Sequence, residues 1–205
     1  MTILSSLLAD VRACTICEAH LPLGPRPVFQ LHPKARILIV GQAPGKKVHN
    51  LGVPFDDASG NRLREWLGVT REVFYDPEQI AILPMGLCFP GSGRSGDFPP
   101  RPECAPAWHT QLLGQLRHLE VTLVLGQYAQ AYHFGKTTSS LTELVKSWRI
   151  YWPQMVPLPH PSPRNNLRLH RNPWFESELL PPLRKRVGEV LARLSWLNAT
   201  CSGAG

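Results

Sequence analysis

The sequence predicts a three-layer α/β/α sandwich around a central, mainly parallel four-stranded sheet. Short apolar runs that suit buried strands alternate along the chain with longer segments of helical periodicity. Two of these runs, 37–40 and 154–158, lead into loops rich in Gly and Pro that carry polar residues, as ligand-binding loops do in open α/β sheets. The length of 205 residues suits one domain with a substantial core.

The expected elements follow one another along the chain. Residues 3–13 have helical apolar spacing, and 37–40 form the first strand. Ser59 caps a helix that ends near Leu67, because its hydroxyl can satisfy free N–H groups in the first turn. The remaining ranges are strands at 80–83, 121–125 and 154–158, and helices at 107–119, 141–149 and 175–197. We expect a single domain over 1–197 and a flexible tail over 198–205.

The charge of the chain favours a polyanionic partner. Its 22 basic and 15 acidic residues leave a formal charge of +7, with an isoelectric point near 9.5. A basic protein without such a partner is the alternative that charge alone leaves open. No run approaches the roughly 20 apolar residues that span a bilayer, and Asp10 and Arg12 fall where a signal peptide stays apolar. We therefore expect a cytoplasmic protein with no membrane partner.

Four cysteines form a candidate metal or cluster site. Cys14 and Cys17 make a C-x2-C pair after the first helix, and Cys88 and Cys104 lie 16 positions apart in an irregular connection rich in Gly, Pro, Ser and Arg. Four thiolates suffice for tetrahedral zinc or for a 4Fe-4S cluster, and the spacing does not choose between them. Ordinary buried thiols are the third possibility, because cysteine is among the most buried residue types. Cys201, near the C-terminal end, is left out of the set.

Two loops carry the candidate chemistry. The strand at 37–40 breaks into Gly41-Gln42-Ala43-Pro44-Gly45, which aims backbone N–H groups and one amide side chain into the crevice at the sheet edge. The second loop follows the run at 154–158 and holds His160 between two prolines. Proline fixes its own φ and restricts the residue before it, so this histidine sits on a stiff loop. Such a histidine is poised to donate or accept one hydrogen bond.

These motifs resemble those of the uracil-DNA glycosylase superfamily, and most closely the family 4 type that holds a 4Fe-4S cluster. The first motif of that type is matched by Gly41-Gln42-Ala43-Pro44-Gly45, followed by Gly52, Pro54-Phe55 and Gly60. His160-Pro161-Ser162 is similar to the second motif, and Pro163-Arg164-Asn165 is similar to the single-strand-selective branch. The four cysteines occupy positions like those of the family's cluster ligands. The resemblance implies that the cluster holds two long loops together and takes no redox part in the reaction.

The resemblance implies a monofunctional DNA glycosylase that hydrolyses the N-glycosidic bond of uracil in single- and double-stranded DNA, initiates base excision repair and acts as a monomer. In this reading His160 donates a hydrogen bond to the base, and Phe55 stacks on the flipped base. Backbone groups of Gly41, Gln42 and Ala43 also contact the base. The residues expected to contact DNA are Ser162, Pro163, Arg164, Asn165, Lys46 and Lys47. No lysine sits beside either motif in an obvious Schiff-base position, so lyase activity is not expected.

The chain departs from family 4 in its acidic residues. Gln42 stands where family 4 members carry Glu, and Ala43 stands where the best-known uracil glycosylases have the aspartate that orients water. A conventional general base is therefore missing. Asp57 or His49 is our candidate for the residue that positions water or steadies the sugar cation, and Gln42 stays a candidate member of the catalytic group.

Base recognition is a second departure. Pro84 replaces the asparagine with which family 4 enzymes read the uracil edge, four residues before the third cysteine. Backbone groups of Met85 and Gly86 are the candidates that remain, so tolerance for other deaminated bases is an open possibility. The chain therefore resembles a divergent class related to family 4.

Two other functions stay open from the sequence. A protein that binds damaged or abasic DNA, with the glycosylase fold but little turnover, would account for the missing acidic residue. A cluster-bearing enzyme that acts on free nucleotides is the third reading.

Overall fold

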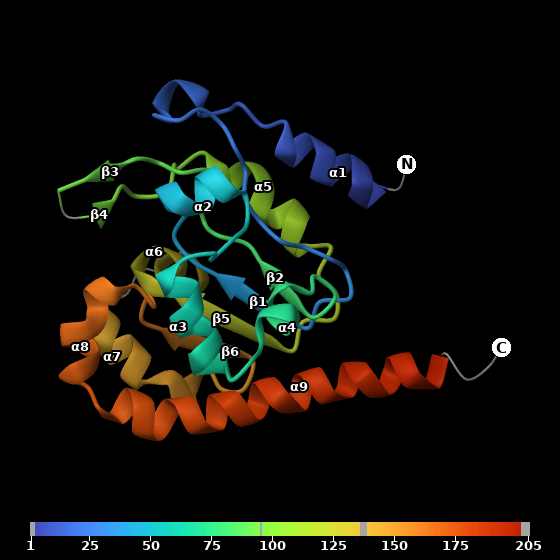
Figure 1. Cartoon of the computed structure of the whole chain (residues 1–205), viewed down its shortest axis with the longest axis vertical. Helices are drawn as coiled ribbons and strands as arrows, with labels where there is room; N and C mark the ends of the chain where they lie inside the picture. Colours follow the sequence, from blue (N-terminus) through green and yellow to red (C-terminus); the bar gives the residue numbers. More distant parts are fainter. Residues whose placement is uncertain (1–2, 95, 136–138, 202–205) are drawn as a thin grey trace.

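The central sheet consists of four parallel strands, as the sequence predicts. A computed structural model describes residues 3–94, 96–135 and 139–201. Within them the strand order is β2-β1-β5-β6 (Figure 1), and every neighbouring pair is parallel. The bounds are β1 Ile37–Val40, β2 Ile80–Ile82, β5 Val121–Leu125 and β6 Met155–Leu158. All four strands therefore end at the same edge of the sheet.

Helices connect and cover these strands, and a small antiparallel hairpin lies apart from the sheet. The α-helices are α1 Ile3–Arg12, α2 Lys46–Leu51, α3 Ala58–Leu67, α4 Arg71–Tyr75, α5 Cys104–Leu113, α6 Gly126–His133, α7 Leu141–Lys146, α8 Asn166–His170 and α9 Leu180–Cys201. Short 3-10 turns are η1 Glu18–His20, η2 Trp148–Ile150 and η3 Pro163–Asn165, and η4 Phe175–Leu179 is a π-helical turn. The hairpin consists of β3 Ser92–Gly93 and β4 Gly96–Asp97.

The strands are buried on both faces, which makes three layers. Successive side chains of a strand point to opposite faces. Ile37 and Ile39 of β1 pack in one cluster with residues of α3 and α9, while Leu38 and Val40 pack in a second cluster with residues of α1 and α5. Figure 1 shows α9 on one side of the sheet and α1 and α5 on the other. Burial of both faces explains why these strands are continuous apolar runs in the sequence.

Several helix boundaries differ from the predicted ones. The helix expected to be capped by Ser59 begins at Ala58, because Asp57 is the cap and accepts a hydrogen bond from the Gly60 N–H at 2.9 Å. The helix predicted over 107–119 is α5, which starts earlier and ends at Leu113. The range 141–149 divides into α7 and η2, and the helices α2, α4, α6 and α8 were not predicted. Short helices of this kind show too few turns for a clear period.

The last predicted helix divides into η4 and α9. Pro181 and Pro182 fall in the first turn of α9, where the absence of their N–H groups is tolerated. α9 runs to Cys201, so its last residues occupy part of the range 198–205 that the sequence assigns to a flexible tail. The rest of that range, 202–205, lies outside the described residues. In the described chain no helix is both long and apolar enough to span a membrane.

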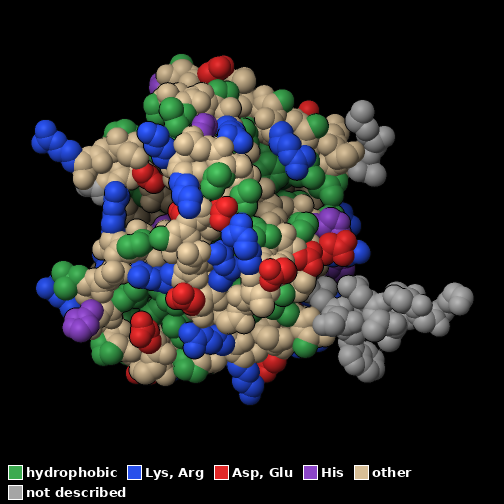
Figure 2. All heavy atoms as spheres, in the orientation of Figure 1, with side chains coloured by type: hydrophobic (Ala, Val, Ile, Leu, Met, Phe, Trp, Pro, Cys, Tyr) green, Lys and Arg blue, Asp and Glu red, His purple; other side chains and the backbone are tan. Residues whose placement is uncertain are grey.

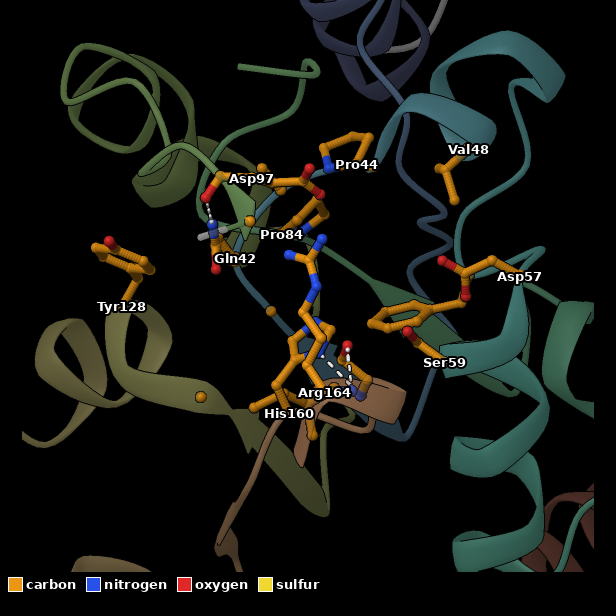
Figure 3. A pocket seen from close by; sticks show the side chains of 18 of the residues that line it. Gln42, Pro44, Val48, Asp57, Ser59, Pro84, Asp97, Tyr128, His160 and Arg164 are labelled. Atoms are coloured by element: carbon orange, nitrogen blue, oxygen red, sulfur yellow. Dashed lines mark hydrogen bonds between the residues drawn. The ribbon is translucent and has the colours of Figure 1, made fainter. Parts of the chain in front are cut away.

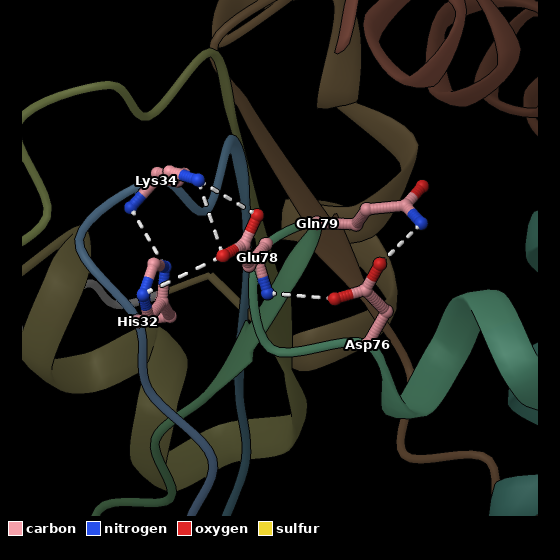
Figure 4. Close-up of polar contacts among 5 residues, drawn as sticks. All are labelled: His32, Lys34, Asp76, Glu78 and Gln79. Carbon is pink, nitrogen blue, oxygen red and sulfur yellow. Dashed lines mark hydrogen bonds and ion pairs between the residues drawn. The ribbon is translucent and has the colours of Figure 1, made fainter. Parts of the chain in front are cut away.

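Polar contacts fasten the amino ends of β1 and β2 (Figure 4). Lys34, which precedes β1, places its Nζ 3.0 Å from Glu78 Oε2, and His32 lies beside the same carboxylate. Asp76 accepts hydrogen bonds from the Glu78 N–H at 2.9 Å and from Gln79 Nε2 at 2.7 Å. These contacts order the turn into β2. They lie at the amino edge of the sheet, away from its carboxyl edge.

Two histidines are enclosed near the connection after β2. His109 of α5 is fully buried, and its Nε2 lies 3.0 Å from the carbonyl oxygen of Pro84. The ring of Tyr132 packs edge-on against His109 and also contacts His133. Burial lowers the pKa of His133 to about 4, with a further contribution from His109. Burial also lowers the pKa of His109, although the contact with Pro84 opposes this. Both rings are therefore neutral at pH 7.

We expect the protein to lose stability as the pH falls from 6.5 toward 4. The unfolded chain takes up a proton on this histidine near pH 6.5, whereas folded His133 does so only near 4, so acid favours unfolding in that window. The ring of His133 is partly exposed, so solvent screening reduces the effect of its pKa shift. His133→Gln should therefore reduce the loss of unfolding free energy between pH 7 and pH 4.5 by about 1–2 kcal/mol. Thermal melts at pH 7 and pH 4.5 measure it. His118→Gln, at an exposed position, is the control, and equal pH dependence in both variants would contradict the assignment.

Candidate active site

A pocket of about 600 Å³ opens at the carboxyl edge of the sheet. The loops that follow β1 and β6 form two of its walls, and the start of α6, which follows β5, lies between them (Figure 3). This is the edge at which open α/β sheets bind ligands. The structure therefore brings together the two loops that the sequence singled out, although they lie far apart along the chain.

Most of the residues predicted to act in catalysis, substrate binding or DNA binding line this pocket. Those that do are Gly41, Gln42, Ala43, Phe55, Asp57, His160, Ser162, Arg164 and Asn165. Those that lie outside its lining are His49, Met85, Gly86, Pro163, Lys46 and Lys47.

His160 is held in one orientation and one tautomer. Its Nδ1 accepts a hydrogen bond from the Ser162 N–H at 3.2 Å, and Asn165 Nδ2 donates to the His160 carbonyl oxygen at 2.7 Å. Burial lowers the pKa of His160, while Asp57 and, to a smaller extent, Asp97 oppose that shift. The imidazole is therefore neutral at pH 7. Because Nδ1 is an acceptor, the proton lies on Nε2, and this nitrogen is the donor left for a pocket ligand.

Gln42 uses its amide nitrogen to hold the hairpin of β3 and β4. Its Nε2 donates to the carbonyl oxygens of Phe98 at 2.8 Å and of Asp97 at 3.3 Å, as the dashed line in Figure 3 indicates for Asp97. Two carbonyl acceptors require the nitrogen end of the amide, so the oxygen end is left for other partners. The pocket thus includes the hairpin as well as the two predicted loops.

Phe55 presents an aromatic face in a strained backbone conformation. Its φ is 55°, in the left-handed region that residues other than glycine rarely adopt. The ring packs edge-on against Phe74 at 6.4 Å and lies 6.4 Å from the ring of His160, tilted by 31°. The Phe55 carbonyl oxygen occupies the space where a Cβ on Gly60 would lie, so residue 60 must be glycine.

The structure does not bring His49 to the pocket, contrary to the proposed role in positioning water. His49 is buried on α2 and packs against Phe89, with ring centroids 6.2 Å apart. Burial lowers its pKa, and the charge of Arg26 lowers it further. The side chain therefore belongs to the packing between α2 and the segment after β2.

The N–H groups of Met85 and Gly86 are already used within the fold, so the prediction that backbone groups of these residues read the base no longer includes these two donors. The Met85 N–H donates to the Gly41 carbonyl oxygen at 2.8 Å, and the Gly86 N–H donates to that of Gln42 at 2.9 Å. The hydrogen bonds join the segment after β2 to the loop after β1. Pro84 itself lines the pocket.

The surface around the pocket is basic. Arg164 and Arg168 reach the pocket from the segment after His160, and the guanidinium of Arg164 occupies the space where a Cβ on Gly96 would lie. Ser162 caps η3, with its Oγ accepting a hydrogen bond from the Arg164 N–H at 3.3 Å. Figure 2 shows Lys and Arg side chains over this side of the molecule, and the exposed ones include Lys46, Lys47, Arg94, Arg164 and Arg168.

Sequence reasoning missed several pocket residues. Those that line the pocket without having been predicted include Asp97, Ser59, Gln127 and Tyr128. Gln127 and Tyr128 directly follow the strand 121–125 and its terminal glycine, which is a signal that could have found them. Leu167, on α8 beside this edge, is 60% exposed and is a second feature that the sequence analysis did not single out.

The four predicted cysteine ligands lie in one region. Cys17 and Cys88 share a small buried cluster, Cys14 Sγ accepts a hydrogen bond from Trp108 Nε1 at 3.2 Å, and Cys104 Sγ accepts one from the Leu87 N–H at 3.3 Å. Burial raises the pKa of Cys88 to about 11, and Cys17 and Cys14 raise it further. Burial likewise raises the pKa of Cys104 to about 12, with contributions from Cys88, Cys17 and Cys14. Cys14, Cys17 and Cys88 therefore oppose ionisation of neighbouring thiols.

This donor set fits a positively charged group. Buried thiolates need positive charge nearby, and two N–H donors already point at sulfur atoms. In the described residues no three or more Cys, His, Asp or Glu side chains form a group that could hold a single metal ion. The four thiol groups therefore have the chemistry that a cluster requires. Their positions do not define the geometry of a cluster.

The fold and the site define an α/β protein with a polar and aromatic ligand pocket at the carboxyl edge of its parallel sheet, within a basic surface. The family model described as uracil DNA glycosylase superfamily matches residues 29–184. The chain belongs to this superfamily.

Three type-4 uracil-DNA glycosylases are similar to the chain. The one from Thermotoga maritima is 30% identical over 157 residues, which cover 74% of this chain and 78% of that protein. The one from Saccharolobus solfataricus is 27% identical over 169 residues, or 76% and 74% of the two chains. The one from Sulfurisphaera tokodaii is 28% identical over 119 residues, or 56% and 50%.

Gly60→Ala should destabilise the protein by about 2–4 kcal/mol, because the new methyl group collides with the backbone of Phe55. Chemical denaturation measures the change in unfolding free energy. The matched control is Gly188→Ala in α9, where a Cβ meets nothing within 4 Å and a gain of up to about 1 kcal/mol is expected from helix propensity. Equal effects of the two substitutions would show that Phe55 is not held by this contact.

Proposed function

We propose that the protein is a monofunctional DNA glycosylase that hydrolyses the N-glycosidic bond of uracil in single- and double-stranded DNA and so initiates base excision repair. The observation that carries the proposal is the neutral imidazole of His160, whose Nε2–H is free to donate in the pocket. Membership of the superfamily and likeness to type-4 enzymes support it. We further propose that the protein works as a monomer in the cytoplasm.

In this mechanism the uracil nucleotide leaves the stack and enters the pocket, and its ring lies against Phe55. Cleavage of the bond leaves negative charge on the departing base. A hydrogen bond from His160 Nε2 to a uracil oxygen strengthens as that charge develops, so it stabilises the transition state more than the ground state. No proton has to leave His160, which agrees with a ring held neutral by burial.

The basic surface positions the DNA. Arg164, Arg168, Lys46 and Lys47 attract the phosphates, and Ser162 contacts the backbone beside the flipped nucleotide. The exposed side chain of Leu167 suits the gap that the extruded base leaves, because apolar wedges of this kind fill opened base steps.

Hydrolysis without strand cleavage is the expected outcome. Among the described residues that line the pocket there is no lysine to form a Schiff base with the sugar. Lys46 and Lys47 lie on the exposed first turn of α2, outside the lining.

A second candidate function is a protein that binds damaged or abasic DNA with little turnover. The observation that favours it is Gln42, whose amide holds the hairpin of β3 and β4 at the place where family 4 enzymes have a carboxylate. An enzyme that acts on free nucleosides is the third. Excision from an oligonucleotide separates the first function from both alternatives.

We also propose that Cys14, Cys17, Cys88 and Cys104 hold a 4Fe-4S cluster, with zinc or no metal as the alternatives. When bound, the cluster supplies the positive charge that lets these thiols ionise and joins the segment after α1 to the segment between β2 and α5. Its role in this proposal is to hold loops in place.

His160→Ala should lower single-turnover uracil excision by about 10²–10³-fold, because it removes the donor to the departing base. A labelled uracil-containing oligonucleotide is incubated with excess protein, treated with alkali and run on a denaturing gel. Exposed His118→Ala is the control and should retain the wild-type rate. DNA retention without strand breakage by the wild-type protein would favour the binding function, and excision of free nucleosides alone would favour the third.

Protein purified without oxygen should be brown and contain about four iron atoms per chain, with broad visible absorption. Cys88→Ser should lose the iron and the colour, because serine is a poor ligand for such clusters. Iron analysis and an absorption spectrum give the result, and Cys201→Ser is the matched control that should keep both. A colourless wild-type protein containing zinc would replace the cluster by the zinc alternative.

A further inference from the structure

Two carboxylates face the pocket within the described part of its lining, Asp57 and Asp97. Hydrolysis of a glycosidic bond needs a water molecule oriented toward the sugar carbon, and a carboxylate is well suited to accept its proton. Neither Gln42 nor Ala43 can supply this group. The two aspartates differ in what holds them and in where they lie.

Asp57 is committed to the structure of α3. One of its carboxylate oxygens accepts the hydrogen bond from the Gly60 N–H that begins the helix. Gly60, whose N–H Asp57 binds, lies directly against the Phe55 carbonyl oxygen. Asp57 is therefore best placed to fix the turn that carries Phe55.

Asp97 lies across the pocket from His160, on β4 (Figure 3). The Ser92 hydroxyl donates to Asp97 Oδ1, which orients the carboxylate. The other oxygen, Oδ2, lies 3.4 Å from the place where a Cβ on Gly45 would be, beside the loop after β1. In the proposed reaction, a carboxylate opposite the donor to the base faces the sugar side of the bond that breaks.

Gln42 holds Asp97 in this position. Its Nε2 donates to the Asp97 and Phe98 carbonyl oxygens, and the Phe98 N–H donates to the Gly91 carbonyl oxygen at 2.9 Å. An ionised glutamate at position 42 would repel both carbonyl oxygens, because it has no hydrogen to donate. Gln42, which stands where family 4 enzymes carry a carboxylate, therefore keeps a different carboxylate, that of Asp97, at the pocket.

We propose that Asp97 is a catalytic residue that orients and deprotonates the attacking water, and that Gln42 is the positioning residue that keeps it there. The bond between the sugar C1′ and the uracil N1 breaks with its electron pair moving to N1, which leaves a cationic sugar and the uracil anion. Water adds to C1′ and gives a proton to Asp97, and that proton then passes to solvent or to the uracil anion. The products are uracil and an abasic site. This inference rests on the proposed glycosylase function.

Asp97→Asn should lower single-turnover excision of uracil by about 100-fold or more, because the amide keeps the size of the side chain and loses the proton acceptor. DNA affinity should stay the same or rise, since a negative charge next to the phosphates is removed. Excision is measured by the alkali and gel assay, and affinity for the same oligonucleotide by fluorescence anisotropy. Asp10→Asn, at an exposed position of α1, is the matched control for loss of one carboxylate and should excise at the wild-type rate.

Two failures are distinguishable. If the wild-type protein does not excise uracil, the glycosylase function and the role of Asp97 fall together. If the wild-type protein excises uracil and Asp97→Asn stays within about threefold of it, the role of Asp97 alone is wrong. Equal melting temperatures of the wild-type and Asp97→Asn proteins show that a lost rate is not lost folding.

The role of Gln42 has its own test in the pH profile. Gln42→Glu should lower excision at least tenfold at pH 8, and its rate relative to wild type should recover as the pH falls toward 5, because a protonated glutamate regains one donor. Gln42→Leu has no donor at any pH and should show no relative recovery. Wild-type rates in Gln42→Glu at pH 8, or the same pH profile for both variants, would overturn the assignment of Gln42.

Discussion

The parallel direction of β1, β5 and β6 is the constraint on which the site depends. Because these strands end at one edge, the loop after β1, the start of α6 and the loop after β6 surround one pocket. Antiparallel placement of β1 or β6 would carry its loop to the opposite edge of the sheet. The apolar residues that bury the strands on both faces therefore determine the position of the pocket as well as the core.

The electrostatics of the site combine a neutral donor with a charged surface. His160 is kept uncharged by burial and has its Nε2–H available to donate, whereas the exposed arginines and lysines lie at the rim of the pocket or outside it. This separation lets the surface hold a polyanion while the interior offers directional hydrogen bonds. A preoriented neutral donor is effective in a pocket from which water is excluded, because it needs no rearrangement when charge develops.

The sheet and the two motif loops were predictable because their signals are local: buried strands are short apolar runs, and stiff loops contain Gly and Pro at fixed positions. The position of Asp97 in the pocket could not be predicted, because β3 and β4 are two residues each and show no alternation of apolar and polar residues. His49 was misplaced because the orientation of α2, which turns it toward Phe89, depends on tertiary packing. The donors of Met85 and Gly86 were likewise consumed by contacts with a loop distant in sequence.

Cys88 and Cys104 stand at the two ends of the segment that contains β3 and β4. The Leu87 N–H donates to Cys104 Sγ at 3.3 Å and closes this segment at its base. A loop whose ends are fastened has fewer conformations open to it, so the thiols limit how far the hairpin can move. Loss of this contact at the base of the loop would also free the far side of the segment, where Asp97 lies, so residues distant from the pocket help to set the position of one of its carboxylates.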